Sequence, residues 1–537
     1  MAALIEGLTL HSFGDIEFFK KDGSKANLRS RDSKKGMSER FLRYERLRWV
    51  FVDEASTASV EVLATLEQNI RIATRESHTW AQRSSGVARR WGGMNVVFCG
   101  DMWQFRPVKA TAIFDNPFTQ RKSSSVGAMM QLFWCKNHEG LTDFFELTVE
   151  RRCKDPWLSW FLRSARHGTM DHETYCFTHG LPTRHAGSWM PDRDVVLCGQ
   201  QNCRQLATRW DKELQGPTPS SWEARRSQEC EACSLERRRR CRVLGCSDLS
   251  PDVGEMRFAE APYVHPFNAP KYHASQLRAE HYARRKNIIL LWLVAEDKPL
   301  HKDHQSLSPE ELQAKRDQWL TYHDQQTGGI MGLQPLALGM PLRITQTILQ
   351  HKDKRLFKNA RCTLHGWKLH PVDEERLRHT AEQQLVLQHM PEQLFIRMEA
   401  ATWVAHSELG PGVVGLKPVT TTWAIDKQWQ LIVKRRGFPV ASDFSGTAHS
   451  FVGATLRAAL IDCLPWDHEP NQQDQLSGYM CFSRVEHIED VCVVQPHSPA
   501  LFTQGDLPGP NLLLSLWRGD VAQEDLRHEW TMREPRK

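Results

Sequence analysis

Two short apolar runs, each followed by acidic residues, constrain the fold of this chain more than any other feature. Residues 49–52 (Trp-Val-Phe-Val) end at Asp53 and Glu54, and residues 95–99 (Asn-Val-Val-Phe-Cys) end just before Asp101. Apolar runs of this length, bounded by turn residues, are typical of buried parallel strands. In parallel sheets ligands bind beyond the carboxyl ends of the strands, so both acidic ends are candidate site positions.

The stretch between the two runs has the pattern of a helix. Val62, Leu66, Ile70 and Ala73 recur at the spacing of one helical face. Strands that alternate with helices imply an α/β fold with a parallel sheet. Later runs with strand character occupy residues 194–198, 458–461 and 491–494.

The rest of the chain suggests two α/β domains with insertions. We expect a first domain over residues 1–185 and a second over residues 186–537. Residues 205–330 interrupt the alternation with a cysteine cluster and an arginine block, and we predict that they form an insertion. Residues 360–440 are rich in Trp, Thr and Val and predict a small β insertion.

Composition narrows the class of protein. A hydrophobic fraction of 40% and a charged fraction of 25% fit a globular protein with real cores. The longest apolar run, residues 288–295, is too short to span a bilayer, and no secretory signal is visible. The net charge of +6 permits a polyanionic partner without requiring one. The 14 cysteines are too few for a disulfide scaffold, so we expect a reducing, intracellular compartment.

Asp53 and Glu54 could carry nucleotide chemistry. In NTPases one such carboxylate helps to hold Mg²⁺ and the next polarises the attacking water. The same pair could instead cap the following helix, and this motif alone leaves both interpretations open. On the second loop, Gln104 could contact a γ-phosphate, or the loop could be a polar turn closed by Pro107.

Taken together, the two loops resemble motifs II and III of the PIF-type helicases, a RecD-related branch of superfamily one. Residues 53–56 match the form Asp-Glu-x-Ser, and residues 100–108 match Gly-Asp-x-x-Gln-x-x-Pro-Val. The resemblance implies an α/β fold made of the two RecA-like parallel-sheet domains of a P-loop helicase, with insertions in the second domain.

Other segments of the first half also resemble this family. Residues 7–13 are similar to motif Ia, which meets single-stranded DNA, so the resemblance implies DNA contacts from Thr9, His11 and Ser12. Residues 147–168 align with the motif IV region. That alignment places Arg152 on the phosphate-facing arginine, and it places Cys153 where the family usually has glutamine.

The second half resembles the family in three places. Residues 338–345 are similar to the strand element before a small barrel insertion. Residues 447–456 resemble motif V, although Val452 replaces a glutamine, and residues 479–485 resemble motif VI. The resemblance implies DNA contacts from His449, Gly453 and Thr455. It also implies that Arg484 is an arginine finger, which spreads charge in the transition state.

One family motif is not found. The sequence contains no Gly-x-x-x-x-Gly-Lys-(Ser or Thr), and the nearest fragment, residues 23–25, follows the motif Ia segment. In the family this phosphate-binding P-loop lies before motif Ia. We expect ATP binding by the chain to be weak without it. We interpret this first as an incomplete gene sequence and second as a degenerate relative.

Four cysteines form a candidate zinc site. Cys230, Cys233, Cys241 and Cys246 have the spacing C-x₂-C-x₇-C-x₄-C, and four thiolates suit tetrahedral Zn²⁺. The alternative is a set of unpaired thiols in a loop. If zinc is bound, the arginine block at residues 237–240 would lie inside the metal loop and could face phosphate.

The resemblance implies an ATP-dependent DNA helicase that uses ATP and Mg²⁺. Asp53 would hold Mg²⁺ with ATP, and Glu54 would activate water. Gln104 would sense the γ-phosphate, and Arg152 and Arg484 would neutralise it.

The implied partners are single-stranded DNA and duplex junctions, with no membrane and a monomeric protein. The implied roles are DNA repair, recombination or telomere maintenance, in the nucleus or the mitochondrion. The main alternative is a degenerate, non-catalytic relative that binds nucleic acid. A weaker alternative is a zinc-dependent binding module.

Overall fold

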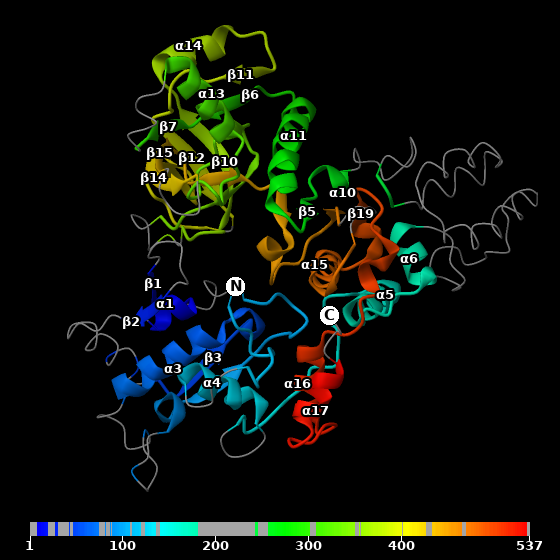
Figure 1. The fold of residues 1–537 in the computed structure, drawn as a ribbon. Helices are drawn as coiled ribbons and strands as arrows, with labels where there is room; N and C mark the ends of the chain where they lie inside the picture. Colours follow the sequence, from blue (N-terminus) through cyan, green and yellow to red (C-terminus); the bar gives the residue numbers. More distant parts are fainter. Residues whose placement is uncertain are drawn as a thin grey trace, which may run out of the picture.

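A computed structural model shows an α/β protein with three regions (Figure 1). A first α/β unit lies at the bottom of the view, a second parallel sheet lies in the middle, and a β-rich module lies at the top. The structure describes residues 8–14, 16–19, 27–30, 42, 44, 47–74, 81, 86, 89–107, 110–119, 124–135, 140–180, 242–244, 256–300, 308–348, 354, 356–399, 401–425, 432–463 and 469–533.

The first unit is built on the two strands that the sequence predicted. β3 (Trp49–Val52) and β4 (Asn95–Phe98) pair in parallel, with Val52 opposite Phe98. The apolar face expected between them is the buried face of α3 (Val60–Thr74), which packs against α4 (Ser125–Trp134). The remaining elements of this unit are α1 (Leu10–Gly14), β1 (Ile16–Phe19), β2 (Asn27–Ser30), η2 (Ala55–Thr57) and η4 (Arg90–Gly93).

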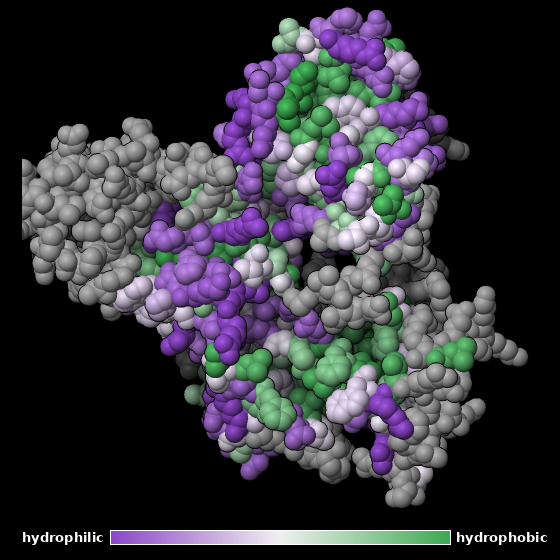
Figure 2. All heavy atoms as spheres, turned by 180° about the vertical axis from the view of Figure 1, so that it is seen from behind, coloured by the Kyte–Doolittle hydropathy of each residue, from purple (hydrophilic) through white to green (hydrophobic). Residues whose placement is uncertain are grey.

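The first sheet buries only one of its faces. Val50 and Val52 are buried, whereas the alternating residues Trp49 and Phe51 are exposed by 56% and 70%. Elsewhere in the first half of the chain, Phe145 is another exposed aromatic residue, at 87%. Seen from behind, apolar residues form green areas on the lower part of the molecule, where this unit lies (Figure 2).

The second unit contains a fully parallel sheet. Its strand order is β17-β5-β18-β19, and residues 242–244 add to its edge through a parallel bridge between Val243 and Val493. The elements of this unit are β5 (Tyr263–His265), β17 (Ser445–Thr447), β18 (Ala459–Ile461), β19 (Val491–Val493), α10 (Met256–Ala259), α11 (Asn268–Lys286), α15 (Gln472–Phe482), η6 (Ala448–Phe451), η7 (Ile488–Asp490) and η8 (Pro499–Phe502).

Two pairs of helices pack on the unit that is distant from them in sequence. α5 (Pro156–His167) and α6 (His172–His179) share an apolar core with the second unit. α16 (Pro508–Arg518) and α17 (Leu526–Arg533) join the core of the first unit. The crossing segments touch at Gly168, where a Cβ would stand 2.4 Å from the backbone nitrogen of Gly505. Packing therefore divides the chain differently from the predicted boundary at residue 185.

The β-rich module lies between α11 and β17 in the sequence. Its strands form antiparallel pairs except for the parallel pair of β6 and β11. Its elements are β6 (Leu290–Val294), β7 (Glu296–Pro299), α13 (Pro309–Leu320), β8 (Leu333–Leu336), β9 (Pro341–Ile344), β10 (Arg361–Lys368), α14 (Pro371–His379), β11 (Gln384–Val386), β12 (Gln393–Met398), β13 (Val413–Leu416), β14 (Val419–Ala424), β15 (Ile432–Gly437) and β16 (Val440–Ser442).

The module's limits differ from those of the two predicted insertions. Residues 263–286 fall within the predicted 205–330 insertion, but they supply β5 and α11 to the second unit. The 338–345 element belongs to the module, because β9 pairs with both β10 and β16. Strand partners far apart in sequence decide these limits, and a single apolar run does not reveal its partner.

In the described part of the chain, no helix is both long enough and apolar enough to cross a membrane. The predicted strand at residues 194–198 and most of the 205–330 segment lie outside the described residues.

Candidate functional site

The carboxyl ends of β3 and β4 are held together by backbone contacts. The backbone nitrogen of Ala55 donates a hydrogen bond to the carbonyl of Cys99 at 2.9 Å. A Cβ at Gly100 would stand 3.0 Å from that same nitrogen, so a glycine allows the two loops to approach closely. This contact holds Asp53 and Glu54 beside the loop that carries Asp101.

Glu54 carries a carboxylate in a strained and partly desolvated position. Its backbone has φ +52°, which is unusual for a residue other than glycine. Its Oε2 atom is buried without a hydrogen-bond partner in the described part of the protein. Burial raises the pKa of Glu54, and the neighbouring charge of Asp53 raises it further. An orphaned carboxylate oxygen next to a second carboxylate suits a cation such as Mg²⁺, which prefers oxygen ligands.

The loop after β4 is tied to helix α5. Arg166 of α5 pairs with the Asp101 carboxylate at 2.7 Å, and its guanidinium lies 4.3 Å from the ring centroid of Trp103. In the residue that follows Trp103, the Oε1 atom of Gln104 is buried and has no hydrogen-bond partner among the described residues. The proposed phosphate sensor is thus held on a fixed loop with its side-chain oxygen unused.

Arg152 and Arg484 face this loop region from the second unit. Arg152 donates hydrogen bonds to the Thr455 hydroxyl and to the Ser483 carbonyl, both at 3.2 Å. Arg484 is only 2% exposed and donates to the carbonyls of Met480 at 3.1 Å and Phe451 at 3.2 Å. Burial lowers the pKa of Arg484 to about 10, and the positive charge of Arg152 adds to the effect.

The structure brings the five predicted catalytic residues into one region. Glu54 lies close enough to Arg484 and Arg152 for both cations to lower its pKa, opposing the effects of burial and of Asp53. Gln104 follows on the Asp101 loop, where its backbone nitrogen donates to the Asp101 carbonyl at 3.0 Å. Arg484, however, directs its hydrogen bonds to its own unit.

The predicted DNA-contacting residues form two groups. Thr9, His11 and Ser12 lie at α1, where the Thr9 hydroxyl accepts a hydrogen bond from the Ser12 backbone at 3.1 Å. His449 and Thr455 flank the turn at Gly453, whose φ is +74°. Thr455 contacts Arg152, so this hydroxyl lies beside an arginine that the sequence predicted for the phosphate site.

Sequence reasoning did not identify two contacts at the site. Phe105 is 1% exposed, packs in the core of the second unit, and stacks on His449 with ring centroids 3.4 Å apart. Tyr479 of α15 has its pKa raised to about 12, mainly by burial and then by the charge of Asp101. An aromatic residue inside a polar loop was the only available signal for Phe105.

The candidate zinc residues Cys230, Cys233, Cys241 and Cys246 lie outside the described residues. Within the described ranges, no group of three or more His, Cys, Asp or Glu side chains is arranged to hold a metal ion.

Comparison with known proteins agrees with the resemblance to PIF-type helicases. The family model described as "PIF1-like helicase" matches residues 1–142. Over 107 residues the chain is 33% identical to the ATP-dependent DNA helicase PIF1 of Saccharomyces cerevisiae (strain YJM789). That stretch covers 20% of this chain and 11% of the yeast protein, so the sequence likeness spans a small part of the relative's length.

Solved structures resemble the chain over nearly its whole length. The Pif1 helicase of Candida albicans matches with a TM-score of 0.50 and 14% identity, covering 97% of this chain and 86% of that one. A structure described as DNA unwinding at forked double-stranded DNA by two coordinating Pif1 helicases also matches with a TM-score of 0.50, at 12% identity, covering 97% and 85%. At this identity the likeness shows the fold, an α/β architecture with RecA-like parallel sheets.

Proposed function

We propose that this chain, a relative of the PIF1-type helicases in its first 142 residues and in its fold, is the motor region of an ATP-dependent DNA helicase. The motor would translocate on single-stranded DNA and unwind duplexes at junctions. Nucleotide would lie between the two α/β units, and closing and opening of the units would move the strand.

One observation carries the proposal. Glu54 of the first unit lies within the electrostatic reach of Arg152 and Arg484, and both arginines are hydrogen-bonded to the second unit. Phosphoryl transfer depends on such an arrangement, because catalysis consists mostly of positioning and of stabilising charge. A site divided between two units also explains how nucleotide could control their closure.

The residues present fit a magnesium nucleotide on the carboxylate side. Asp53 would hold Mg²⁺ with ATP, which supplies charge neutralisation at the phosphates when bound. Glu54 would orient and deprotonate the attacking water, as its raised pKa suits a general base. Gln104 would place its amide toward the γ-phosphate, and Arg152 and Arg484 would stabilise the charge that develops there.

The alternative is a relative that binds nucleic acid without hydrolysing ATP. Two observations favour it. No Gly-x-x-x-x-Gly-Lys-(Ser or Thr) occurs in the 537 residues, so a phosphate cradle of that type is not supplied by this sequence. Arg484 is also occupied by carbonyls of its own unit, so it must exchange partners before it can reach a nucleotide.

The deciding experiment compares two proteins. The 537-residue chain should bind an oligo-dT strand with salt-sensitive affinity but show little DNA-stimulated ATP turnover. The same chain joined at its N-terminus to the P-loop segment of a PIF1-like helicase should gain DNA-stimulated turnover and should unwind a forked duplex. Its control carries alanine in place of the P-loop lysine.

Each outcome has a distinct meaning. Robust turnover by the 537-residue chain alone would show that it holds phosphates by another route. A P-loop-bearing protein that binds DNA but never hydrolyses ATP would establish the non-catalytic alternative. Failure of both proteins to bind single-stranded DNA would rule out both functions.

The wider biological assignments follow from the same proposal. We place the protein in DNA repair, recombination or telomere maintenance, as a monomer in the nucleus or the mitochondrion. Imaging of the tagged protein tests the compartment.

The proposed zinc site at the four cysteines is tested separately. Freshly purified protein should contain about one zinc per chain, and serine at Cys230 and Cys233 should remove it. Protein without zinc would leave these residues as unpaired thiols.

A further inference from the structure

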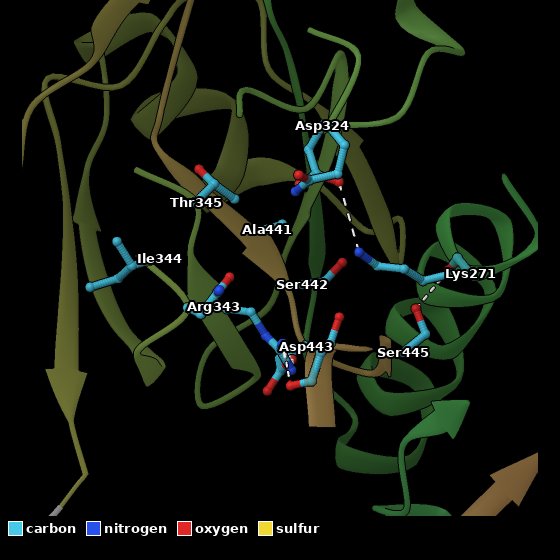
Figure 3. A pocket seen from close by; sticks show the side chains of 12 residues that line it. Lys271, Asp324, Arg343, Ile344, Thr345, Ala441, Ser442, Asp443 and Ser445 are labelled. Atoms are coloured by element: carbon cyan, nitrogen blue, oxygen red, sulfur yellow. Dashed lines mark hydrogen bonds and ion pairs between the residues drawn. The ribbon is translucent and has the colours of Figure 1, made fainter. Parts of the chain in front are cut away.

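A polar pocket lies where the β-rich module meets the second unit. It holds about 350 Å³ of space, part of it open to solvent. Its walls come from the first turn of α11, from β9 and β16, and from the segment that leads through β17 to η6 (Figure 3). The lining residues used below are Lys271, Asp324, Arg343, Asn359, Asp443 and Ser450. None of them belongs to the nucleotide site or to the predicted DNA contacts.

The carboxylate of Asp443 is already neutralised. Arg343 donates to its Oδ1 atom at 2.7 Å, and Arg361 lies 3.1 Å from its Oδ2 atom. Its side chain is 5% exposed. Asp443 therefore has no free oxygen to offer a metal cation in the pocket.

Lys271 is a pocket cation whose ammonium has unused hydrogen-bonding capacity. Its side chain is 16% exposed and points across the pocket toward Asp324 (Figure 3). The distance from Nζ to the Asp324 carboxylate is 3.9 Å, longer than a hydrogen bond. Asp324 instead accepts from the Gln325 side chain at 2.7 Å. Among the described residues the Lys271 ammonium has no hydrogen-bond acceptor, and a partly buried ammonium favours an added oxyanion.

The balance of charge favours an anion. Arg361 pairs with Asp443 from outside the pocket lining, so three cations (Lys271, Arg343 and Arg361) stand against the two carboxylates Asp324 and Asp443, with an excess of one positive charge. A metal cation would find one carboxylate there and would lie beside an ammonium. An oxyanion would complete the ammonium's hydrogen bonds without breaking an existing ion pair.

The pocket also adjoins the expected path of the DNA. Arg343 donates to the backbone carbonyl of Ser450 at 3.1 Å, and Ser450 follows His449 directly. A strand in contact with His449 would therefore pass close to the pocket with its backbone. This step rests on the proposed function, since it takes His449 as a DNA contact.

We propose that this pocket binds a phosphate group of a single-stranded nucleic acid, with Lys271 as the main donor and the Asn359 side chain as a second. It would hold the strand at the joint between the β-rich module and the second unit. A phosphate bound there would also link the orientation of the β-rich module to the presence of a nucleic-acid strand.

The first test measures binding of oligo-dT to the full chain by fluorescence anisotropy over a range of salt concentrations. Lys271→Met keeps most of the apolar stem and removes the charge. It should weaken binding about three- to ten-fold and reduce the slope of log K against log salt by about 0.7, the loss of one single-strand phosphate contact. The matched control is Lys286→Met, an exposed lysine at the far end of the same helix, which should change neither quantity.

A second variant separates the loss of a neutral hydrogen-bond donor from the loss of a positive charge. Asn359 has φ +71°, a conformation that glycine adopts freely, so Asn359→Gly removes the amide without straining the turn. It should weaken binding about two-fold and leave the salt slope unchanged, because a neutral donor releases no counterion.

A second ligand identifies the source of the phosphate. Pyrophosphate should raise the melting temperature of the wild-type chain, and Lys271→Met should abolish that rise. If Lys271→Met binds oligo-dT as Lys286→Met does, the backbone-phosphate assignment is wrong, and a Lys271-dependent pyrophosphate effect would then indicate a site for free anions. If the wild-type chain does not bind oligo-dT, the proposed function fails. In that case the pyrophosphate result alone tests the pocket. If the melting temperature shows no shift that depends on Lys271, the proposed anion site is wrong.

Discussion

The two sides of the proposed nucleotide site differ in how completely their polar atoms are bonded. On the carboxylate side, Glu54 Oε2 and Gln104 Oε1 are buried without partners among the described residues. On the arginine side, Arg484 is buried and donates to two backbone carbonyls and to the Ser483 hydroxyl. The carboxylate side therefore has buried oxygens that a ligand could bond, whereas the Arg484 guanidinium already bonds to groups of its own unit. Catalysis would require Arg484 to give up part of its structural role.

Arg484 should produce the largest effect. In a P-loop-bearing form of the chain, Arg484→Ala should lower ATP turnover about 10³-fold or more, as expected for loss of an arginine finger. It should also lower the free energy of unfolding by about 3 kcal/mol, since two buried carbonyls lose their donor. Turnover assays and urea titrations measure the two effects.

Arg484→Lys distinguishes the catalytic role from the structural one. Lysine keeps the charge but cannot reproduce the planar fork, so the protein should fold while turnover stays low. Arg163→Ala, at an exposed position of α5, is the control and should behave as wild type. Normal turnover in Arg484→Lys would mean that the motif VI assignment is wrong.

Substitutions at Phe105 test whether apolar packing connects the loop of the first unit to the core of the second unit. Phe105→Ala should lower the free energy of unfolding by about 3–4 kcal/mol, because it removes a buried ring from the core of the other unit. Phe105→Leu should cost less than about 1.5 kcal/mol. Phe145→Ala, at a ring that is 87% exposed, should stay within about 0.5 kcal/mol. Equal losses for the two alanine variants in urea titrations would show that Phe105 does not connect the units.

A pair of buried histidines behind the arginine side should make stability depend on pH. His179 and His497 are both 0% exposed, with ring centroids 4.5 Å apart, and each Nδ1–H donates to a backbone carbonyl. The groups around them are the Tyr175 ring and Arg242, which pairs with Glu489 at 3.6 Å. Burial lowers the pKa of His497 to about 4 and holds that of His179 well below its usual value.

Because these pKa values are lower in the folded state, the histidines favour the fold when neutral. Stability should be complete above pH about 6.5 and should fall as the pH drops toward about 4. Each histidine should contribute up to about 1.4 kcal/mol per pH unit. His497→Gln should flatten the pH profile of unfolding, and the exposed-histidine control His273→Gln should not. A His497→Gln profile as steep as wild type would contradict this origin.

The smallest effect on the free energy of unfolding should come from the carboxylate side. The raised pKa of Glu54 means that its charged form opposes folding at neutral pH. Glu54→Gln should therefore raise the free energy of unfolding by about 0.5–1 kcal/mol while it removes turnover in the P-loop-bearing protein. Thermal melts at pH 7 and pH 4 measure this, and the gain should shrink at the lower pH. A loss of stability at both pH values would mean that Glu54 is a structural residue.

The sequence by itself determined the local features of this protein. Each of these features follows from a pattern of residues that are close together in the sequence. They are the strands that end shortly before Asp53 and Asp101, the buried face of α3, and the individual motifs. Such features depend on local periodicity and turn chemistry, which a single sequence displays directly.

Only the tertiary structure decided which distant residues meet. It placed Phe105 in the core of the other unit, exchanged helices between the two units, and joined residues 288–442 into one module. It also bonded Arg484 to carbonyls of its own unit, and it left the Lys271 ammonium facing a pocket with no hydrogen-bond acceptor among the described residues. These outcomes depend on contacts between segments that are far apart in the chain, and no local pattern specifies such a partner.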